Sequence, residues 1–141
     1  MDAAALGPEQ AALQRARLHL RGGKRRLRQG RISLGIAALF DGLISAMDWH
    51  YACAEGRARV SDVPGDFRGE HDRYAALVRS AVLDGTFDFD RFALLVDRAL
   101  EMELPAGDAA GIAAGVESVL TQLGVLPFDE CALPPEDPAT L

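Results

Sequence analysis

The chain has 141 residues, two cysteines and a formal net charge of −6. This length suits one domain whose core needs no disulfide or metal for support. Cys53 and Cys131 lie far apart and form no CxxC pair, so their spacing indicates neither a zinc site nor a disulfide framework. The N-terminus lacks a signal-peptide pattern, and the longest apolar stretch is interrupted by Asp41. Because a membrane span needs about 20 apolar residues, we expect a cytoplasmic protein that does not enter a membrane.

The charges are distributed unevenly along the chain. Residues 1–31 hold eight basic and two acidic residues, whereas the remaining 110 residues hold seven basic and nineteen acidic ones. Such a division indicates either a face that binds polyanions or two surfaces of one chain that attract each other.

The first two predicted helices cover residues 8–29 and 33–55. Pro8 suits a first helical turn, one apolar stripe continues through Gly22 and Gly23, and Gly30 ends the segment. Ser33 is the predicted N-cap of the second helix. The second helix has an apolar face formed by Ile32, Ile36, Leu39, Phe40, Leu43 and Met47. Its flank of small residues, where a neighbouring helix can approach closely, consists of Gly35, Gly42, Ala46 and Cys53.

Three further helices are predicted after a loop that contains Pro64-Gly65. The third covers residues 70–83 and has apolar residues at helical spacing. The fourth begins at the cap Asp88 and stops before Pro105, and the fifth runs from the cap Asp108 to Gly124. The residues predicted to be buried in the fourth helix are Phe89, Phe92, Leu95, Val96, Ala99 and Leu100.

No segment alternates with a period of two for long enough to form a strand, so the predicted fold class is all-α. We expect a single helical bundle of four to five helices over residues 1–128. Residues 129–141 are acidic and rich in proline, and we expect this tail to be poorly ordered.

Residues 14–55 resemble the first two helices of the HEPN-like helical bundles. The matching stretch, ARLHLRGGKRRLRQGRISLGIAALFDGLISAMDWHYACAE, has an Ala/Leu helix, a glycine turn and a second helix rich in small residues. The resemblance implies an up-and-down bundle that often dimerises and often partners a nucleotidyltransferase. Some members are ribonucleases that use an arginine and a histidine with four to six residues between them. This chain has no such spacing, so the ribonuclease chemistry is not carried over.

Two histidines are the candidates for chemistry outside that resemblance. His50 falls in the apolar stripe of the second helix, where a buried, hydrogen-bonded histidine is more common than a catalytic one. His71 stands between Glu70 and Asp72, but successive helical side chains point about 100° apart and cannot share one ion. We therefore predict no metal site, no cofactor and no catalytic residues. Trp49 falls beside the central stripe, where it can contact another helix or another subunit.

A row of basic residues in the first helix is the candidate polyanion site. It consists of Arg17, Arg21, Lys24, Arg25 and Arg28. Several cations at helical spacing can neutralise phosphates, but no aromatic residue is interleaved for base stacking. We expect these side chains to face acidic parts of the same chain instead.

The favoured function is a non-catalytic protein-interaction module that forms a homodimer. The proposed dimer interface comprises Trp49, Gly35, Gly42 and Ala46. The alternative is a HEPN-type domain that binds nucleic acid, or partners a nucleotidyltransferase, through the arginine-rich first helix.

Overall fold

The computed structural model describes residues 7–53, 69–128 and 133–135. The elements in these ranges are α1 (Pro8–Arg28), α2 (Ile32–Ala52), α4 (Glu70–Arg79), α5 (Phe89–Glu101), the short 3₁₀ helix η2 (Ala106–Ala109) and α6 (Ile112–Gln122). The described residues contain no strand, and the predicted all-α bundle is confirmed. The loop around Pro64-Gly65, the predicted end of the second helix at Glu55, and residues 129–132 and 136–141 of the tail lie outside the described residues.

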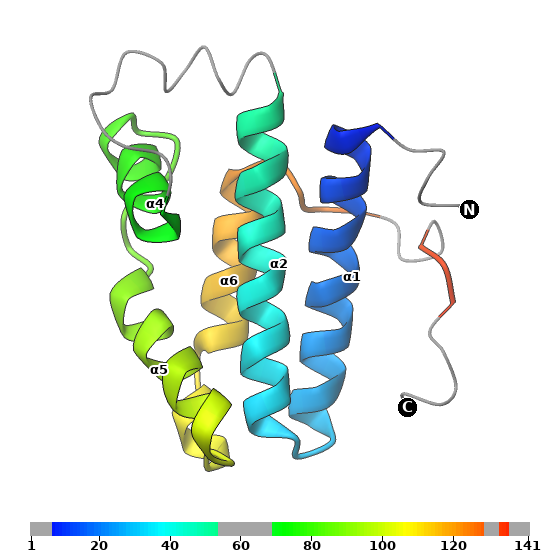
Figure 1. Ribbon diagram of the computed structural model, residues 1–141, viewed down its shortest axis with the longest axis vertical. Coiled ribbons are helices and arrows are strands. Elements are labelled where there is room, and N and C mark those ends of the chain that lie inside the picture. Colours follow the sequence, from blue (N-terminus) through cyan, green and yellow to red (C-terminus); the bar gives the residue numbers. More distant parts are fainter. Residues whose placement is uncertain (1–6, 54–68, 129–132, 136–141) are drawn as a thin grey trace.

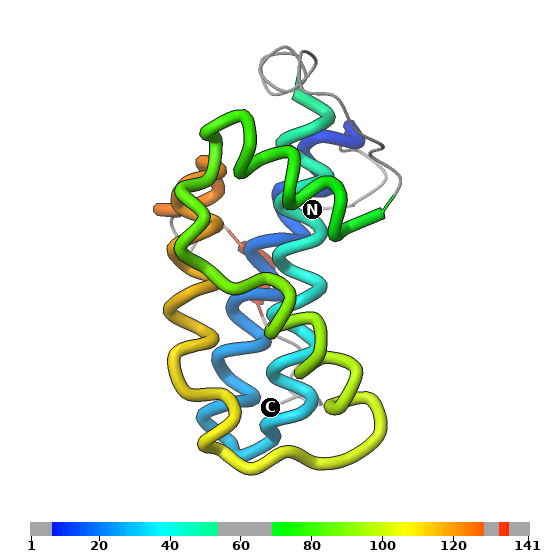
Figure 2. Tube along the Cα trace, turned by 90° about the vertical axis from the view of Figure 1, so that its left-hand side faces the viewer, coloured from blue at the N-terminus to red at the C-terminus, as the bar shows by residue number. Residues whose placement is uncertain are grey.

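Helix α2 lies in the middle of the bundle (Figure 1). Helix α1 packs along one side of it, α4 and α5 form the opposite edge, and α6 lies behind. Figure 2 shows the edge formed by α4 and α5 from outside. The large side chains that α2 buries completely are Ile36, Leu39, Leu43 and Met47. Every other helix therefore builds its part of the core against α2.

Helices α1 and α2 come close together because glycines face each other across the pair. A Cβ atom on Gly35 would lie 2.7 Å from Leu27 Cδ2 and 3.1 Å from the carbonyl oxygen of Gly23. A Cβ atom on Gly23 would lie 2.9 Å from Leu39 Cγ, and one on Gly42 would lie 3.3 Å from the carbonyl oxygen of Ala16. Helix α1 runs from Pro8 to Arg28, so the prediction that it continues through Gly22 and Gly23 is confirmed. A glycine is needed at Gly23 because the backbone of α2 lies so close to it.

We expect Gly35→Ala to lower the free energy of unfolding by about 1–2 kcal/mol, since overpacking costs more than alanine gains in helix propensity. Urea unfolding followed by circular dichroism measures the change. Gly107→Ala is the matched control, because a Cβ atom there meets nothing within 4 Å. Equal stability of the Gly35 variant and the wild type would contradict the close-contact explanation.

The N-terminus of α2 is held by residues about 70 positions further along the chain. Glu103 Oε1 accepts hydrogen bonds from the backbone amides of Ile32 at 2.9 Å and of Ser33 at 3.2 Å. The Ser33 hydroxyl donates to the carbonyl of Met102 at 2.6 Å and accepts from the amide of Leu104 at 2.8 Å. The prediction that Ser33 is the N-cap is therefore wrong. Ser33 lies inside the helix, and the Glu103 carboxylate takes the capping role.

Replacing the buried Ser33 by alanine should cost about 1–3 kcal/mol, because the Met102 carbonyl and the Leu104 amide both lose a partner. Ser118→Ala provides the comparison, since its hydroxyl takes part only in an exposed contact with Gln122 on the same helix. Thermal unfolding of both variants should show a lower midpoint for Ser33→Ala alone. Similar midpoints would show that the hydrogen bonds of the Ser33 hydroxyl do not stabilise the fold.

Two other helix boundaries and one predicted burial differ from the predictions. Helix α4 ends at Arg79, not Leu83, because Ala81 adopts a positive φ of 64° and the chain turns back to bury Val82 and Leu83. Asp108 does not cap α6, which begins after Gly111 at a φ of 78°.

Leu100 was predicted to be buried, but it is 74% exposed. It lies on a flank of α5 outside the stripe that contains Phe92 and Leu95. The Asp88 cap is confirmed, since its carboxylate accepts a hydrogen bond from the amide of Arg91 at 3.0 Å.

Helix α2 has 21 residues and is long and apolar enough to cross a membrane by length and composition alone. This length departs from the expectation that no segment is long enough to span a membrane. However, 61% of the apolar window is buried inside the bundle, as expected of a core helix.

Candidate functional site

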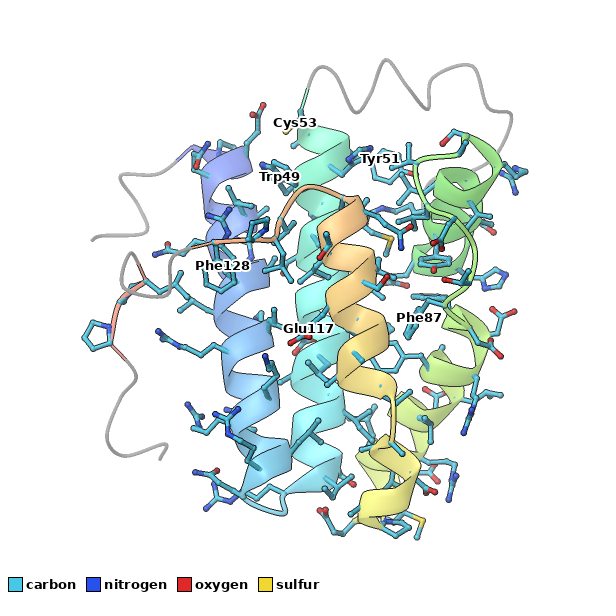
Figure 3. The ribbon with its side chains drawn as sticks, turned by 180° about the vertical axis from the view of Figure 1, so that it is seen from behind. Trp49, Tyr51, Cys53, Phe87, Glu117 and Phe128 are labelled. Carbon is cyan, nitrogen blue, oxygen red and sulfur yellow. The ribbon has the colours of Figure 1, made fainter. Side chains whose placement is uncertain are left out.

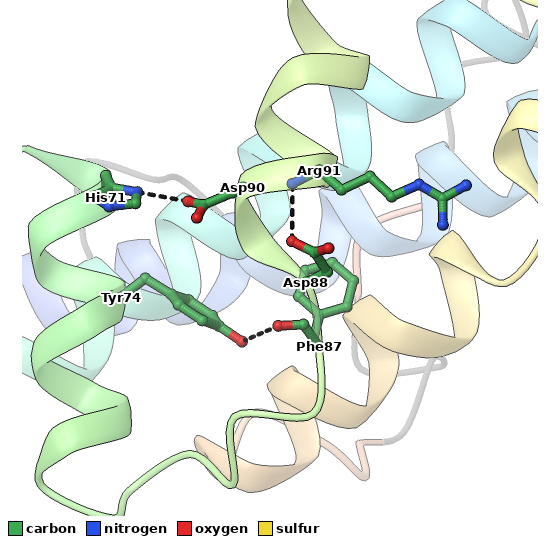
Figure 4. A network of polar contacts seen from close by, with 6 residues as sticks. All are labelled: His71, Tyr74, Phe87, Asp88, Asp90 and Arg91. Atoms are coloured by element: carbon green, nitrogen blue, oxygen red, sulfur yellow. Dashed lines mark hydrogen bonds and ion pairs between the residues drawn. The ribbon is translucent and has the colours of Figure 1, made fainter.

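A cavity of about 590 Å³ lies between α4 and the start of α5 and contains a histidine–carboxylate pair. His71 Nδ1 lies 2.8 Å from Asp90 Oδ1, and the imidazole ring lies 6.3 Å from the ring of Phe89 (Figure 4). Both members of the pair are mostly exposed, with 66% and 71% of their side-chain surface open to solvent. The pair resembles a surface ion pair more than a catalytic dyad, which needs a nucleophile held within hydrogen-bond reach of the base.

Tyr74 forms the inner wall of this cavity. Its ring stacks on Phe89 with centroids 4.6 Å apart, and its hydroxyl donates to the carbonyl of Phe87 at 3.4 Å. Burial, together with the charges of Asp84 and Asp88, raises the pKa of Tyr74 to about 12. Tyr74 is therefore a neutral packing residue at physiological pH.

The raised pKa of Tyr74 predicts a loss of stability in alkali. Between pH 10 and 12 the folded chain keeps the phenol proton that the unfolded chain releases, so the free energy of unfolding falls as the pH rises. The contribution of this one group is on the order of 2 kcal/mol. Urea midpoints measured at pH 9 and pH 11.5 should fall less in Tyr74→Phe than in the wild type. Equal falls would show that Tyr74 ionises in the folded chain at its ordinary pKa.

His50 lies where the sequence predicted, with 7% of its surface exposed. Its ring meets that of Tyr51 edge-on, with centroids 6.1 Å apart. Tyr51 in turn donates a hydrogen bond to the carbonyl of Arg73 on α4 at 2.9 Å. The predicted burial of His50 is confirmed.

Trp49 and the flank of small residues pack within the chain. Gly35 and Gly42 face α1, as described above, and Ala46 is completely buried. The Trp49 ring packs against the core, and Figure 3 shows it near the end of α6, where a Cβ atom on Gly124 would lie 3.5 Å from it. The interface predicted at Gly35, Gly42 and Ala46 is therefore wrong, because α1 of the same chain covers the two glycines and Ala46 is buried inside the chain.

The basic row of α1, defined as Arg17, Arg21, Lys24 and Arg28, mostly faces the C-terminal part of the same chain. Arg17 donates to the carbonyl of Val125 at 3.2 Å, and Arg21 donates to that of Pro134 at 2.8 Å. Lys24 forms an ion pair of 2.5 Å with Glu117 on α6, and burial lowers the pKa of Arg17 from its ordinary value.

The two remaining members of the predicted polyanion site lie apart from these contacts. Arg25 is buried, whereas Arg28 is exposed at the end of the row. The expectation that these side chains face acidic parts of the same chain thus holds for Lys24, which pairs with Glu117, whereas Arg17 and Arg21 bind main-chain carbonyls of their own chain.

The outward face of α5 is a candidate surface that was not predicted from the sequence. Leu94 is 65% exposed at its centre, and charged residues surround it. These residues are Asp90, Arg91, Asp97 and Arg98. Their spacing of three and four residues from Leu94 is a signal in the sequence that predicts one shared helical face.

No group of three or more His, Cys, Asp or Glu residues in the described ranges is placed to hold a metal ion. No protein-family model, no curated protein and no solved structure matches this chain. The HEPN-like resemblance of residues 14–55 stays a prediction. The features that bear on function are therefore the outward face of α5 and the basic row of α1.

Proposed function

We propose that this chain is a non-catalytic helical interaction module that forms a homodimer through α5. The observation that carries the proposal is the order of charges on the outward face of this helix. Asp90 and Arg91 precede Leu94 by four and three residues, and Asp97 and Arg98 follow it by three and four. All five side chains lie on exposed positions.

This order is complementary to itself when two copies of α5 lie antiparallel. A two-fold axis through Leu94 sets the residue n positions before it opposite the residue n positions after it in the partner. Asp90 then meets Arg98 of the second copy, Arg91 meets Asp97, and the two Leu94 side chains meet at the axis. A closed two-fold interface uses the same patch on both subunits and therefore needs this kind of self-complementarity.

The existing contacts of these charges do not prevent the new pairing. Asp90 pairs with His71 at a mostly exposed position, and Arg98 Nη2 lies 3.5 Å from Oδ2 of the partly exposed Asp108. Exposed pairs of this kind contribute at most about 1 kcal/mol each. Because α5 has only 13 residues, the interface is small and belongs to the weak, reversible class.

The protein-interaction proposal is favoured over the nucleic-acid alternative by the contacts of α1. Arg17, Arg21 and Lys24 already bind groups of their own chain. Phosphates would have to displace these contacts before they could bind the basic row.

The test uses two charge-switched variants of the full chain. Asp90→Arg with Asp97→Arg makes the face entirely basic, and Arg91→Asp with Arg98→Asp makes it entirely acidic. Each variant alone should sediment as a monomer at concentrations where the wild type dimerises, because like charges now meet across the axis. An equimolar mixture should form a heterodimer, measured by analytical ultracentrifugation at low ionic strength.

Two single substitutions test whether the dimer depends on Leu94 at the two-fold axis or on any exposed leucine of α5. Leu94→Arg should abolish the dimer, whereas Leu100→Arg should leave it intact, since Leu100 is exposed on a different flank of the same helix. A wild-type chain that stays monomeric at hundreds of micromolar, or a mixture that fails to associate, would refute the proposal.

A further inference from the structure

The cavity between α4 and the start of α5 is formed by the turn that joins these two helices. Helix α4 ends at Arg79, and the chain turns back through Ala81 and Gly85, whose φ angles are 64° and 80°. Gly85 comes so close to α4 that a Cβ atom on it would lie 3.2 Å from Val78 Cγ1. The turn therefore places residues 86–88 beside α4, and both segments line the cavity.

Part of the lining of this cavity is apolar and aromatic. The residues concerned are Tyr74, Ala75, Val78, Phe87 and Phe89. Tyr74 and Phe89 are buried and stack on each other, whereas the other three keep part of their surface exposed. A volume of about 590 Å³ lies in the range of small-molecule sites, whose walls are mostly apolar with a few polar groups. The apolar part of the lining thus suits the body of a small organic molecule.

The polar part of the lining includes two carboxylates at the start of α5. Asp88 Oδ1 accepts a hydrogen bond from the backbone amide of Arg91 at 3.0 Å, and Asp90 Oδ1 lies 2.8 Å from His71 Nδ1. Each contact uses one oxygen, and an ionised carboxylate accepts hydrogen bonds with both. The side chain of Arg91 points away from His71 and Tyr74 (Figure 4). The two carboxylates can therefore accept hydrogen bonds from a bound molecule.

The charges that act on Tyr74 are negative. Burial raises the pKa of Tyr74 to about 12, and the carboxylates of Asp84 and Asp88 add to this rise. Arg79 also lines the cavity, but its charge acts on Tyr51 of α2. Burial raises the pKa of Tyr51, and nearby arginines, Arg79 among them, oppose that rise. The inner wall of the cavity therefore favours a positive ligand over a negative one.

We propose that this cavity binds a small organic cation, an amine whose ammonium group pairs with Asp88 while its apolar body packs against Phe87 and Val78. An ammonium group donates hydrogen bonds and accepts none, which matches carboxylate acceptors. Aromatic rings attract a cation as well. Asp90 adds to the negative charge at the same edge. An anionic ligand would be repelled by both carboxylates, and an uncharged one would gain the apolar contacts alone.

The test compares three probes that share one aromatic body, namely phenethylamine, phenethyl alcohol and phenylpropionate. At neutral pH the first is a cation, the second is uncharged and the third is an anion. Amide NMR spectra of the full chain measure the affinity of each probe and show which residues it contacts. The amine should bind at least about fivefold more tightly than the alcohol, because it alone gains the ion pair and the attraction to the rings. The anion should bind more weakly than the alcohol.

Two variants test whether the amine lies in the cavity. Asp88→Asn removes the charge and keeps the helix cap, because asparagine caps helices as well as aspartate does. It should weaken amine binding at least about fivefold and leave alcohol binding unchanged. Asp41→Asn makes the same change at an exposed position of α2 outside the cavity and should alter neither affinity. Ala75→Leu fills the cavity from α4 and should weaken binding of both probes. Circular dichroism shows whether each variant is folded.

Several results would overturn the proposal. Failure of the amine to bind at millimolar concentrations, or equal affinity for amine and alcohol, would remove the role of the carboxylate. Unchanged amine binding in Asp88→Asn or in folded Ala75→Leu would place the amine elsewhere on the surface. Tighter binding of the anion would assign the cavity to the opposite charge. Tighter binding of tetralysine than of the amine, with the same dependence on Asp88, would make a basic segment of a protein the ligand. One chain supplies the whole lining, so failure of the proposed α5 dimer leaves this test unaffected.

Discussion

The bundle depends on the close contact between α1 and α2. Because Gly23 and Gly35 place bare backbone against the partner helix, Leu27 and Leu39 fill the space that two Cβ atoms would need. This contact uses the flank of small residues on α2, while Phe40 packs against Phe89 and Phe92 of α5 on another side. Helix α2 is therefore largely covered by its own chain. The surfaces left for partners lie on the outer helices, where α5 faces solvent and α1 faces the C-terminal connection.

Much of the fold follows from local patterns that the sequence displays. The apolar spacing of α2 and α5 predicts which residues enter the core, and Asp88 is a cap because its carboxylate reaches an amide three residues ahead. The error at the start of α2 comes from contacts between distant residues. Ser33 has the composition of an N-cap, but Met102 and Leu104 bind its hydroxyl, and the Glu103 carboxylate takes the amides. A window of sequence around Ser33 contains no information about residues 70 positions away.

For the candidate surfaces too, the sequence predicts which residues share a helical face but not which part of the chain covers that face. Helical spacing predicts that Arg17, Arg21 and Lys24 share one face of α1, and it also predicts that Gly35 and Gly42 share one face of α2. It does not predict what covers either face. In the structure α1 covers the glycines, and the end of α6 with the C-terminal connection covers the basic row. The order of charges around Leu94 is different, since self-complementarity can be seen in the sequence once α5 is known to have an exposed face.

The position of α5 in the bundle has a consequence for the proposed dimer. Helices α1 and α5 lie on opposite sides of α2 (Figure 1). A two-fold dimer through α5 would therefore leave α1 of each copy on the outer side, away from the axis. The contacts that Arg17 and Lys24 make with their own chain would be kept in such a dimer, because α5 contributes to neither of them.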